Sequence, residues 1–449
     1  MINDSICALV TPNGVGAIGV IRVSGPNAID LVSDFFSKNI KSAKSHTLHF
    51  GTFLNKQGEL IDEVLLSIFH EGKSYTGEQS VEISCHGSSY VLSKVMECLT
   101  QNGCRTAEPG EFTKRAFLNG KLDLSQAEAV ADLISSESKG MHKVALHQLK
   151  GHFSNELKQL REQLIDFASL IELELDFGEE DVEFADRDKL SSLLKKVLGH
   201  VQKLADSFAL GNAMKKGVPV AIVGAPNTGK STLLNSLIGE DRAIVSDIAG
   251  TTRDVIEETF NIDGILFRFI DTAGIRETIE KIESIGIERA KKKIEEATIV
   301  LCLSDSEAAM PELHSWANNI RVQFPEKHIL CIQNKCDLFP KQQSNDKELR
   351  ISAKTGTGLD ALKKQLVNAI TKGKNWSNQT IITSARHHEA LLKTSEALEK
   401  ALFGLSAEIS ADLVALDIRN AMYHLGSITG DISSDELLGN IFSRFCIGK

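Results

Sequence analysis

The segment Gly224-Ala-Pro-Asn-Thr-Gly-Lys-Ser231 has the spacing of a phosphate-binding loop. In such a loop, backbone N–H groups surround phosphate oxygens. The ammonium group of Lys230 can lie between the β- and γ-phosphates, and the hydroxyl of Ser231 can bind Mg²⁺. An apolar strand expected over 218–223 precedes the loop and a helix expected over 232–238 follows it, which is the context that this motif requires.

Three further segments follow in the order of a guanine-nucleotide site: Asp271-Thr-Ala-Gly274, Asn334-Lys335-Cys336-Asp337 and Ser352-Ala353-Lys354. Asp271 can reach the Mg²⁺ shell, and the Gly274 amide can reach the γ-phosphate. The carboxylate of Asp337 can accept hydrogen bonds from N1–H and N2–H of guanine, which adenine cannot match, and the third segment can close over the base. The set resembles the motifs of translation-factor-type GTPases and predicts GTP rather than ATP.

The residues expected to act in hydrolysis differ from those of Ras-like proteins. Ile275 stands where a Ras-like protein has the Gln that orients the attacking water. No Arg is an evident finger, so another positive charge is needed in the transition state. The acids of the following segment are candidates for a catalytic acid or base, and composition alone does not choose among Glu277, Glu280, Glu283 and Glu288.

A monovalent cation could supply that charge. The side-chain oxygen of Asn227 could bind such an ion, and the backbone carbonyls of Ser246 and Ile248 could complete a potassium cage. Thr252, in the same expected switch segment, can complete the Mg²⁺ shell. The predicted GTP-binding residues are Asn227, Thr228, Gly229, Lys230, Ser231, Thr232, Ser246, Asp247, Ile248, Ala249, Gly250, Thr251, Thr252, Asp271, Thr272, Ala273, Gly274, Asn334, Lys335, Asp337, Ser352, Ala353 and Lys354.

Alternating strands and helices must position these motifs. Apolar runs at 218–223, 265–270, 299–303 and 328–332 indicate strands of a doubly wound parallel sheet. Apolar residues three and four apart predict helices on both sides of this block, for example Leu157, Leu160 and Leu164 before it and Leu391, Leu398 and Leu402 after it. We therefore expect a Ras-like P-loop domain (the G domain) inserted into a helical domain.

Residues 1–120 read as an α+β domain, with strands at 17–23 and 64–69 and a helix at 91–99. The expected domains are 1–120, a helical domain made of 121–214 and 376–449, and the G domain at 215–375. The fold class is thus a multidomain chain that combines α/β and α+β parts.

Composition limits the class of protein. The chain has 449 residues and a net charge of −10, which excludes a general polyanion binder, although a local basic face could still bind nucleic acid. Its 8 Cys form no C-x-x-C pair, so a zinc site is not expected. No apolar run reaches the roughly 20 residues that a membrane span needs, and the first residues do not resemble a signal peptide. We expect a cytoplasmic protein without a membrane partner.

Segments outside the nucleotide motifs resemble, over essentially the whole chain, the bacterial tRNA-modification GTPase family MnmE (TrmE). They are Gly19–Gly25, Tyr75–Glu78 with Val81–Gly87, Pro109–Leu124 and the terminal Phe445-Cys-Ile-Gly-Lys449. The resemblance implies a folate-binding, dimerising N-terminal domain and a potassium-stimulated GTPase. It also implies a flavoprotein partner, MnmG (GidA), which holds FAD and joins the homodimer in a heterotetramer or larger complex.

With that partner, the family adds an aminomethyl or carboxymethylaminomethyl group to carbon 5 of the wobble uridine of certain tRNAs. The implied one-carbon donor is a tetrahydrofolate derivative, 5-formyl- or methylenetetrahydrofolate. The implied folate residues are Arg22, Glu82, Lys121 and Lys449; the potassium residues are Asn227, Ser246, Ile248 and Thr251; the magnesium residues are Ser231 and Thr252. Glu283 is implied to act through water in hydrolysis, Arg276 matches a nearby residue, and Cys446 matches a cysteine tied to the modification.

Two other classes fit part of the sequence. A regulatory or ribosome-assembly GTPase switch would use the same phosphate loop, but it would not need a folate-type N-terminal domain or the Cys-Ile-Gly-Lys end. A folate-dependent transferase with incidental GTP binding would keep its modification activity after loss of GTP hydrolysis.

Overall fold

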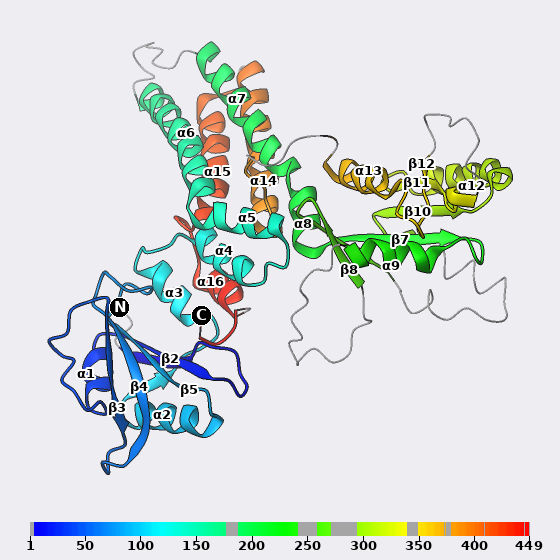
Figure 1. Cartoon of the computed structure of the whole chain (residues 1–449). Helices are drawn as coiled ribbons and strands as arrows, with labels where there is room; N and C mark the ends of the chain where they lie inside the picture. Colours follow the sequence, from blue (N-terminus) through cyan, green and yellow to red (C-terminus); the bar gives the residue numbers. More distant parts are fainter. Residues whose placement is uncertain are drawn as a thin grey trace. The chain divides into compact units, whose positions relative to one another are not determined.

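The computed structural model describes residues 4–176, 187–240, 258–270, 294–338, 349–371, 373, 379–407, 409–443 and 445–448. The chain divides into two compact units (Figure 1). Unit 1 comprises Met1–Ala131, Gln148–Gln159 and Leu425–Lys449, and unit 2 comprises Asp132–His147 and Leu160–His424. Each unit contains one sheet with helices around it, which confirms the multidomain α/β and α+β fold class.

The sheet of unit 1 has the strand order β3-β4-β5-β2-β1-β6. Its strands are β1 (Ser5–Leu9), β2 (Ile18–Ser24), β3 (Thr47–Leu54), β4 (Leu60–Phe69), β5 (Ser80–His86) and β6 (Cys104–Thr106). All neighbours are antiparallel except β1 and β6. Alternate residues Val64, Leu66 and Ile68 are buried, because side chains of a strand point to opposite faces of the sheet. The strands predicted at 17–23 and 64–69 are confirmed as β2 and as part of β4.

Short helices complete unit 1: α1 (Ala28–Ser33), α2 (Ser89–Gln101), α3 (Glu111–Leu118) and α16 (Asp435–Phe442). The helix predicted at 91–99 lies within α2, whose buried Leu92, Val95 and Leu99 join the core under the sheet. Helix α4 (Leu124–Ile134) begins in unit 1, where Leu124 packs with Phe442 of α16.

Helices α7 (Arg187–Asp206), α8 (Phe208–Lys216) and α14 (Ala385–Ser406) lie within unit 2. Three more helices lie mostly in unit 2, but each has one end among the residues of unit 1: α5 (Lys139–Leu149), α6 (His152–Asp176) and α15 (Ala411–Thr429). Helix α7 packs along α14. On α7, Leu190, Leu194 and Val197 are buried on one face, as their spacing of four and three residues predicts.

The sheet of unit 2 has the order β12-β11-β10-β7-β9-β8, and only the β8–β9 pair is antiparallel. Its strands are β7 (Val218–Gly224), β8 (Glu258–Ile262), β9 (Ile265–Phe269), β10 (Ile299–Ser304), β11 (His328–Gln333) and β12 (Leu349–Arg350). The helices of this part are α9 (Lys230–Glu240), α12 (Met310–Gln323) and α13 (Leu359–Thr371).

Every residue of β10 is buried, as expected for a central parallel strand that is covered on both faces. The parallel arrangement brings the carboxyl ends of β7, β10 and β11 to one edge of the sheet: Gly224 pairs with Leu303, and Ser304 pairs with Gln333. Ligand sites of such sheets lie at this edge. In the part of the chain that the structure describes, no helix is both long and apolar enough to cross a membrane.

Candidate functional site

The phosphate loop follows β7 at the carboxyl edge of the sheet and ends in the first turn of α9. Its backbone conformation requires glycine at two places: Gly224 has φ 159° and Gly229 has φ 92°. A Cβ atom at Gly224 would lie 2.4 Å from the Leu303 carbonyl oxygen, and one at Gly229 would lie 2.3 Å from Asn334 Nδ2. The loop can therefore present backbone N–H groups to an anion, and the start of α9 adds its positive dipole end.

Lys230 and Ser231 lie where side chains that bind a triphosphate and its Mg²⁺ are needed. Lys230 Nζ donates to the carbonyl oxygens of Gly224 at 3.0 Å and Ala225 at 2.8 Å, so the ammonium group lies across the loop. Ser231 and Thr232 are exposed in the first turn of α9, where the Ser231 hydroxyl can bind Mg²⁺. These residues fit a magnesium nucleotide.

Asn334 joins the phosphate loop to the segment predicted to close over the base. Its side chain is buried; Nδ2 donates to the Thr228 carbonyl at 2.9 Å, and Oδ1 accepts from the Ala353 amide at 3.0 Å. Ser236 Oγ of α9 in turn donates to the Ala353 carbonyl at 2.5 Å. One asparagine thus fixes the distance between the phosphate-binding and base-binding parts of the site.

The base-binding side chains lie around this link. Asp337 is exposed in the short 3₁₀ turn Cys336–Leu338, whose Cys336 amide donates to the Ile351 carbonyl at 3.1 Å. Lys335 has φ 59°, and its Nζ lies 2.7 Å from Asp305 Oδ2 at the end of β10. The hydrogen bond from Lys335 lowers the pKa of Asp305, so the carboxylate stays charged and holds the Lys335 stem along the site.

The described part of the predicted nucleotide site therefore comes together at one edge of the sheet, with Ser352 buried and Lys354 exposed beside Ala353. The predicted switch and catalytic residues lie outside the described residues. These are Ser246, Asp247, Ile248, Ala249, Gly250, Thr251, Thr252, Asp271, Thr272, Ala273, Gly274, Arg276 and Glu283. Asn227, the predicted potassium ligand of the loop, is described: it is exposed and has φ 64°.

Unit 1 contains a second group of predicted site residues. Arg22 of β2 faces Glu82 of β5 across the sheet, and both Nε and Nη2 of Arg22 donate to Glu82 Oε1, at 3.0 and 2.7 Å. The guanidinium lies over the rings of Tyr75 and Phe112, at 5.4 and 5.6 Å from their centroids. Because a planar cation and an aromatic ring lie side by side here, the surface can receive a flat heterocycle.

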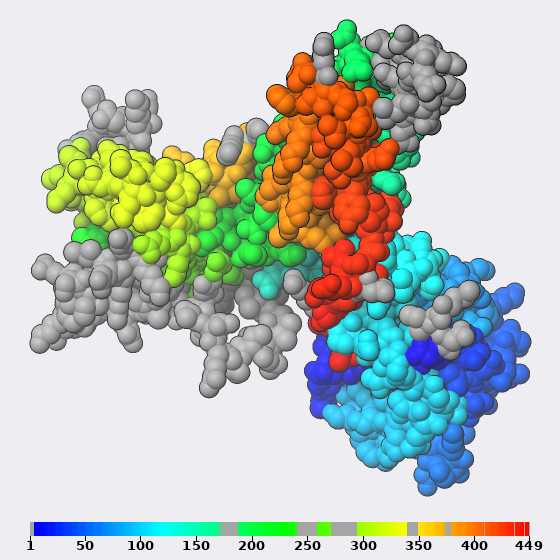
Figure 2. Space-filling view, turned by 180° about the vertical axis from the view of Figure 1, so that it is seen from behind, coloured from blue at the N-terminus to red at the C-terminus, as the bar shows by residue number. Residues whose placement is uncertain are grey.

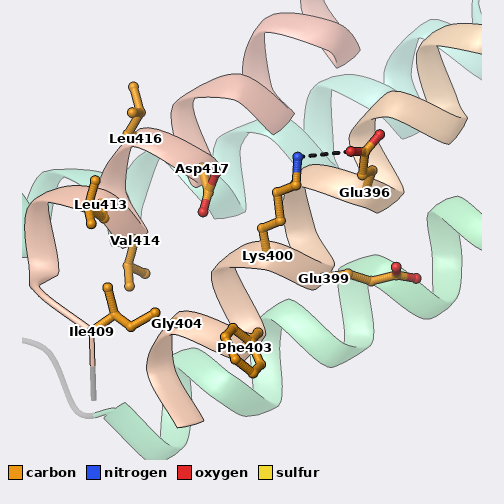
Figure 3. A pocket seen from close by; sticks show the side chains of 10 residues that line it. All are labelled: Glu396, Glu399, Lys400, Phe403, Gly404, Ile409, Leu413, Val414, Leu416 and Asp417. Atoms are coloured by element: carbon orange, nitrogen blue, oxygen red, sulfur yellow. Dashed lines mark ion pairs between the residues drawn. The ribbon is translucent and has the colours of Figure 1, made fainter. Parts of the chain in front are cut away.

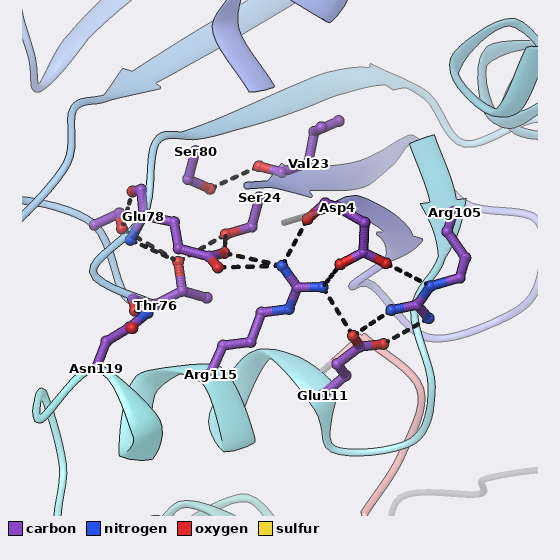
Figure 4. A network of polar contacts seen from close by, with 11 residues as sticks. Asp4, Val23, Ser24, Thr76, Glu78, Ser80, Arg105, Glu111, Arg115 and Asn119 are labelled. Carbon is purple, nitrogen blue, oxygen red and sulfur yellow. Dashed lines mark hydrogen bonds and ion pairs between the residues drawn. The ribbon is translucent and has the colours of Figure 1, made fainter. Parts of the chain in front are cut away.

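A network of ions centred on the buried Arg115 lies on α3 and the segments next to it (Figure 4). The guanidinium of Arg115, only 1% exposed, contacts Asp4 at 2.7 Å, Glu111 at 2.9 Å and Glu78 at 3.1 Å. Arg105 contacts Asp4 as well, at 2.8 Å. Burial raises the pKa of Asp4 and Glu111, but hydrogen bonds from the two arginines outweigh it, so both pKa values lie below their usual range. The ion pairs of Arg115 tie α3 to Asp4, which precedes β1, and to Glu78, which precedes β5.

A cavity of about 880 Å³ lies next to this network, and its volume is in the range of small-molecule binding sites. Glu78, Arg115, Asn119 and Lys121 are among the residues that line it. Lys121 Nζ donates to the Gly72 carbonyl at 2.7 Å. The structure thus places Arg22 and Glu82 together and puts Lys121 at the cavity. In the described part of the chain, Lys121 makes no hydrogen bond or ion pair with Arg22 or Glu82.

The C-terminal segment belongs to unit 1, and Figure 2 shows it in red beside residues coloured blue and cyan. Ile447 pairs with Pro109, and the Gly110 amide donates to the Cys446 carbonyl at 3.3 Å. A Cβ atom at Gly448 would lie 2.4 Å from the Leu9 carbonyl oxygen, on the strand that pairs with β2. The Cys446 thiol is exposed, and Lys449 lies outside the described residues.

Another hollow, of about 550 Å³, lies between α14 and α15 (Figure 3). Apolar side chains such as Phe403 and Leu413 line it together with the acidic Glu399 and Asp417. None of the predicted site residues lines this hollow.

Sequence reasoning gave no role to Arg115 and did not foresee that Asn334 is a bridge. Arg115 follows Glu111 by four residues and stands between the buried Phe112 and Ala116, so its charge falls on the apolar face of α3. A charged residue on such a face signals a buried ion pair. Asn334 offered no comparable signal, because its partners are a loop carbonyl and an amide far away in sequence.

Comparisons with known proteins identify the family of this chain. The family model of the MnmE helical domain matches residues 124–446, and that of the GTP-binding protein TrmE N-terminus matches residues 5–121. The tRNA modification GTPase MnmE of Flavobacterium johnsoniae is 52% identical over 467 residues, with all of both chains covered. Those of Christiangramia forsetii and Bacteroides fragilis (strain ATCC 25285) are each 50% identical, again over the full length of both chains. This chain belongs to the MnmE family of tRNA modification GTPases.

Proposed function

We propose that this chain is the GTP-hydrolysing component of a complex that adds an aminomethyl or carboxymethylaminomethyl group to carbon 5 of the wobble uridine of certain tRNAs. The observation that carries the GTPase part is the Asn334 bridge, which joins a phosphate loop to a base-binding segment carrying Asp337. Membership in a family of tRNA modification GTPases supports tRNA as the substrate.

In this proposal each part of the nucleotide site has a separate role. Lys230 and the loop amides bind the β- and γ-phosphates, and Ser231 with Thr252 holds Mg²⁺. Asp337 selects guanine through its two N–H donors. Glu283 positions the attacking water through a second water. K⁺ supplies positive charge at the phosphates when bound by Asn227, Ser246, Ile248 and Thr251.

Unit 1 is proposed to bind a tetrahydrofolate derivative, which supplies the one-carbon unit when bound. Both bonds from Arg22 go to Oε1 of Glu82, so among the described contacts Oε2 is the oxygen that can accept N–H groups of a pterin. Lys121 and Lys449 would face the glutamate tail. The C-terminal segment of the protein supports this arrangement. Gly448 lies beside Leu9 of β1, and the preceding residue, Ala8, pairs with Arg22.

The wider assembly is part of the same proposal. The chain would act as a homodimer through its N-terminal domain and with the flavoprotein MnmG, which holds FAD. We place the domain boundaries after residues 120, 214 and 375. Cys446 is exposed on the C-terminal segment beside Gly110, where a thiol with a role in the modification reaction would be accessible.

The deciding experiment is nucleoside analysis of tRNA from cells that lack this protein. We expect the modified wobble uridine to disappear and to return with the wild-type gene, but not with Lys230→Ala or Glu82→Ala. The control variant Lys94→Ala removes an exposed lysine of α2 and should restore it. A normal uridine in the deletion strain would refute the proposal and favour a GTPase switch. Restoration by Lys230→Ala would favour a folate-dependent transferase instead.

A further inference from the structure

Two chain connections join the GTP-binding sheet to the helices of unit 2, and they lie side by side. The entry connection is α8, which ends at Lys216, two residues before β7. The exit connection runs through Ile381–Thr383 to α14, which begins at Ala385. Met214 of α8 and Ile381 share one hydrophobic core with the sheet.

The two connections are bonded to each other. The Ile382 amide donates to Ser207 Oγ at 3.0 Å. The backbone of α8 approaches the same residue so closely that a Cβ atom at Gly211 would lie 2.0 Å from the Ile382 carbonyl oxygen. Such a close approach is possible only because Gly211 has no side chain.

A single carboxylate holds both connections. Asp132, near the end of α4, is 6% exposed. Its Oδ1 lies 2.6 Å from Nζ of Lys215 on the entry connection, and its Oδ2 accepts from the Thr383 hydroxyl of the exit connection at 3.0 Å. We call these three residues the junction clamp. A buried carboxylate needs partners for both oxygens, and here each partner comes from a different connection.

Asp132 lies on a helix, α4, that also contributes to unit 1. This helix begins at Leu124, whose side chain packs in unit 1. Leu124 follows Lys121, a residue of the cavity in unit 1, by three positions in the sequence. Asp132 is the first residue of α4 that belongs to unit 2. From Leu124 to Asp132 the helix rises by about 12 Å.

We propose that Asp132 is a positioning residue that holds both connections of the GTP-binding sheet to the helices and thereby couples GTP hydrolysis to tRNA modification. The clamp has no contact with the phosphate loop in the described structure, so it should act on orientation and not on nucleotide binding. The coupling to modification rests on the proposed function, whereas the positioning of the sheet does not.

The test uses the full-length protein with spectroscopic probes at two exposed positions, Val322 of α12 and Phe403 of α14, introduced as unnatural amino acids. Distances between the probes are measured by electron spin resonance with GDP and with a non-hydrolysable GTP analogue. We expect Asp132→Asn and Thr383→Val to broaden the distance distribution by at least half. GDP affinity should stay within twofold of wild type, and the modified uridine in cells should fall at least tenfold.

Matched controls separate the clamp from general destabilisation. Thr371→Val removes another buried threonine hydroxyl, whose partner among the described residues is the Val367 carbonyl of its own helix. Glu389→Gln breaks the exposed ion pair with Lys393. Both controls should leave the distance distribution unchanged, and Thr383→Ser, which keeps the hydroxyl, should restore it. Should Asp132→Asn fail to fold, Thr383→Val decides alone, because it preserves the shape of the side chain.

Two results would overturn the inference. One is an unchanged distance distribution in a folded Thr383→Val protein. The other is a loss of GDP affinity above tenfold, which would make the clamp a support of the nucleotide site. The distance measurement needs no tRNA. A deletion strain with normal wobble uridine would therefore refute the proposed function while the distances still decide on the clamp.

Discussion

Asp337 is the residue that should determine which base the nucleotide site accepts. Its carboxylate is exposed on a turn that the Cys336–Ile351 hydrogen bond holds in place. In Asp337→Asn the side chain can no longer accept from both N1–H and N2–H of guanine. A hydrogen bond to a charged group contributes about 1.5–3 kcal/mol, so we expect GTP affinity to fall roughly tenfold to 150-fold in fluorescence titrations.

The same variant should bind XTP better than wild type does, because xanthine has a carbonyl where guanine has its amino group and the Asn amide can donate to it. Asp360→Asn removes an exposed carboxylate from the first turn of α13 and should change neither affinity. Unchanged GTP binding in Asp337→Asn would show that this residue does not read the base.

Residue roles differ in how well the sequence predicts them. Lys230 and Ser231 follow from the spacing of one short segment, because the loop and the helix that carry them are contiguous. The bridge made by Asn334 depends on Thr228 and Ala353, which come close only when three strands align. The roles of Glu283 and Cys446 came from family resemblance and stay predictions.

At the scale of elements, the phosphate loop and α9 allow a prediction about two glycines, Gly229 and Gly239. Gly229 has φ 92°, and a Cβ there would lie 2.3 Å from Asn334 Nδ2, whereas a Cβ at Gly239 of α9 would meet nothing within 4 Å. Gly229→Ala should therefore push Asn334 away and reduce GTP affinity at least 100-fold.

Gly239→Ala is the matched control, since it adds the same methyl group within α9, the helix that directly follows the loop. It should leave GTP binding unchanged and stabilise the protein by about 0.5–1 kcal/mol, because Ala loses less entropy than Gly in a helix. Titration and thermal unfolding measure both effects. Equal GTP affinity in the two variants would mean that the loop does not need its left-handed glycine.

Strands and helices with strong periodicity were predictable. The four runs expected in the parallel sheet are confirmed as β7, β9, β10 and β11, because a continuous apolar run is what burial on both faces demands. The leucine spacings of α6 and α14 were equally clear. Periodicity did not reveal the pairing of Ile447 with Pro109, because contacts between short irregular segments leave no repeat in the sequence.

At the scale of the whole chain, the two candidate sites belong to different compact units, and α4 is an element shared by both. Alternation of strands and helices predicted the class of each sheet. It could not predict the junction clamp, because Asp132, Lys215 and Thr383 are separated by 83 and 168 residues along the chain. Only the fold brings both connections to one carboxylate.

The last prediction concerns two copies of the chain acting together in hydrolysis. With Ile275 in place of a water-orienting Gln, we assign the transition-state charge to K⁺, bound beside the phosphates once two G domains face each other. An arginine finger contributes 10³–10⁵ in rate, so KCl should support hydrolysis at least roughly tenfold better than NaCl, whose smaller cation cannot span the same cage.

Asn227 has φ 64°, which glycine adopts without strain, so Asn227→Gly removes the proposed ligand without straining the loop. This variant should hydrolyse GTP at the same rate in both salts and keep its nucleotide affinity. Asp263→Gly, at an exposed residue with φ 51°, introduces glycine at a similar backbone angle away from the phosphates and should keep the potassium effect. Equal wild-type rates in KCl and NaCl would rule out potassium as the source of charge, and a full potassium effect in Asn227→Gly would rule out this ligand.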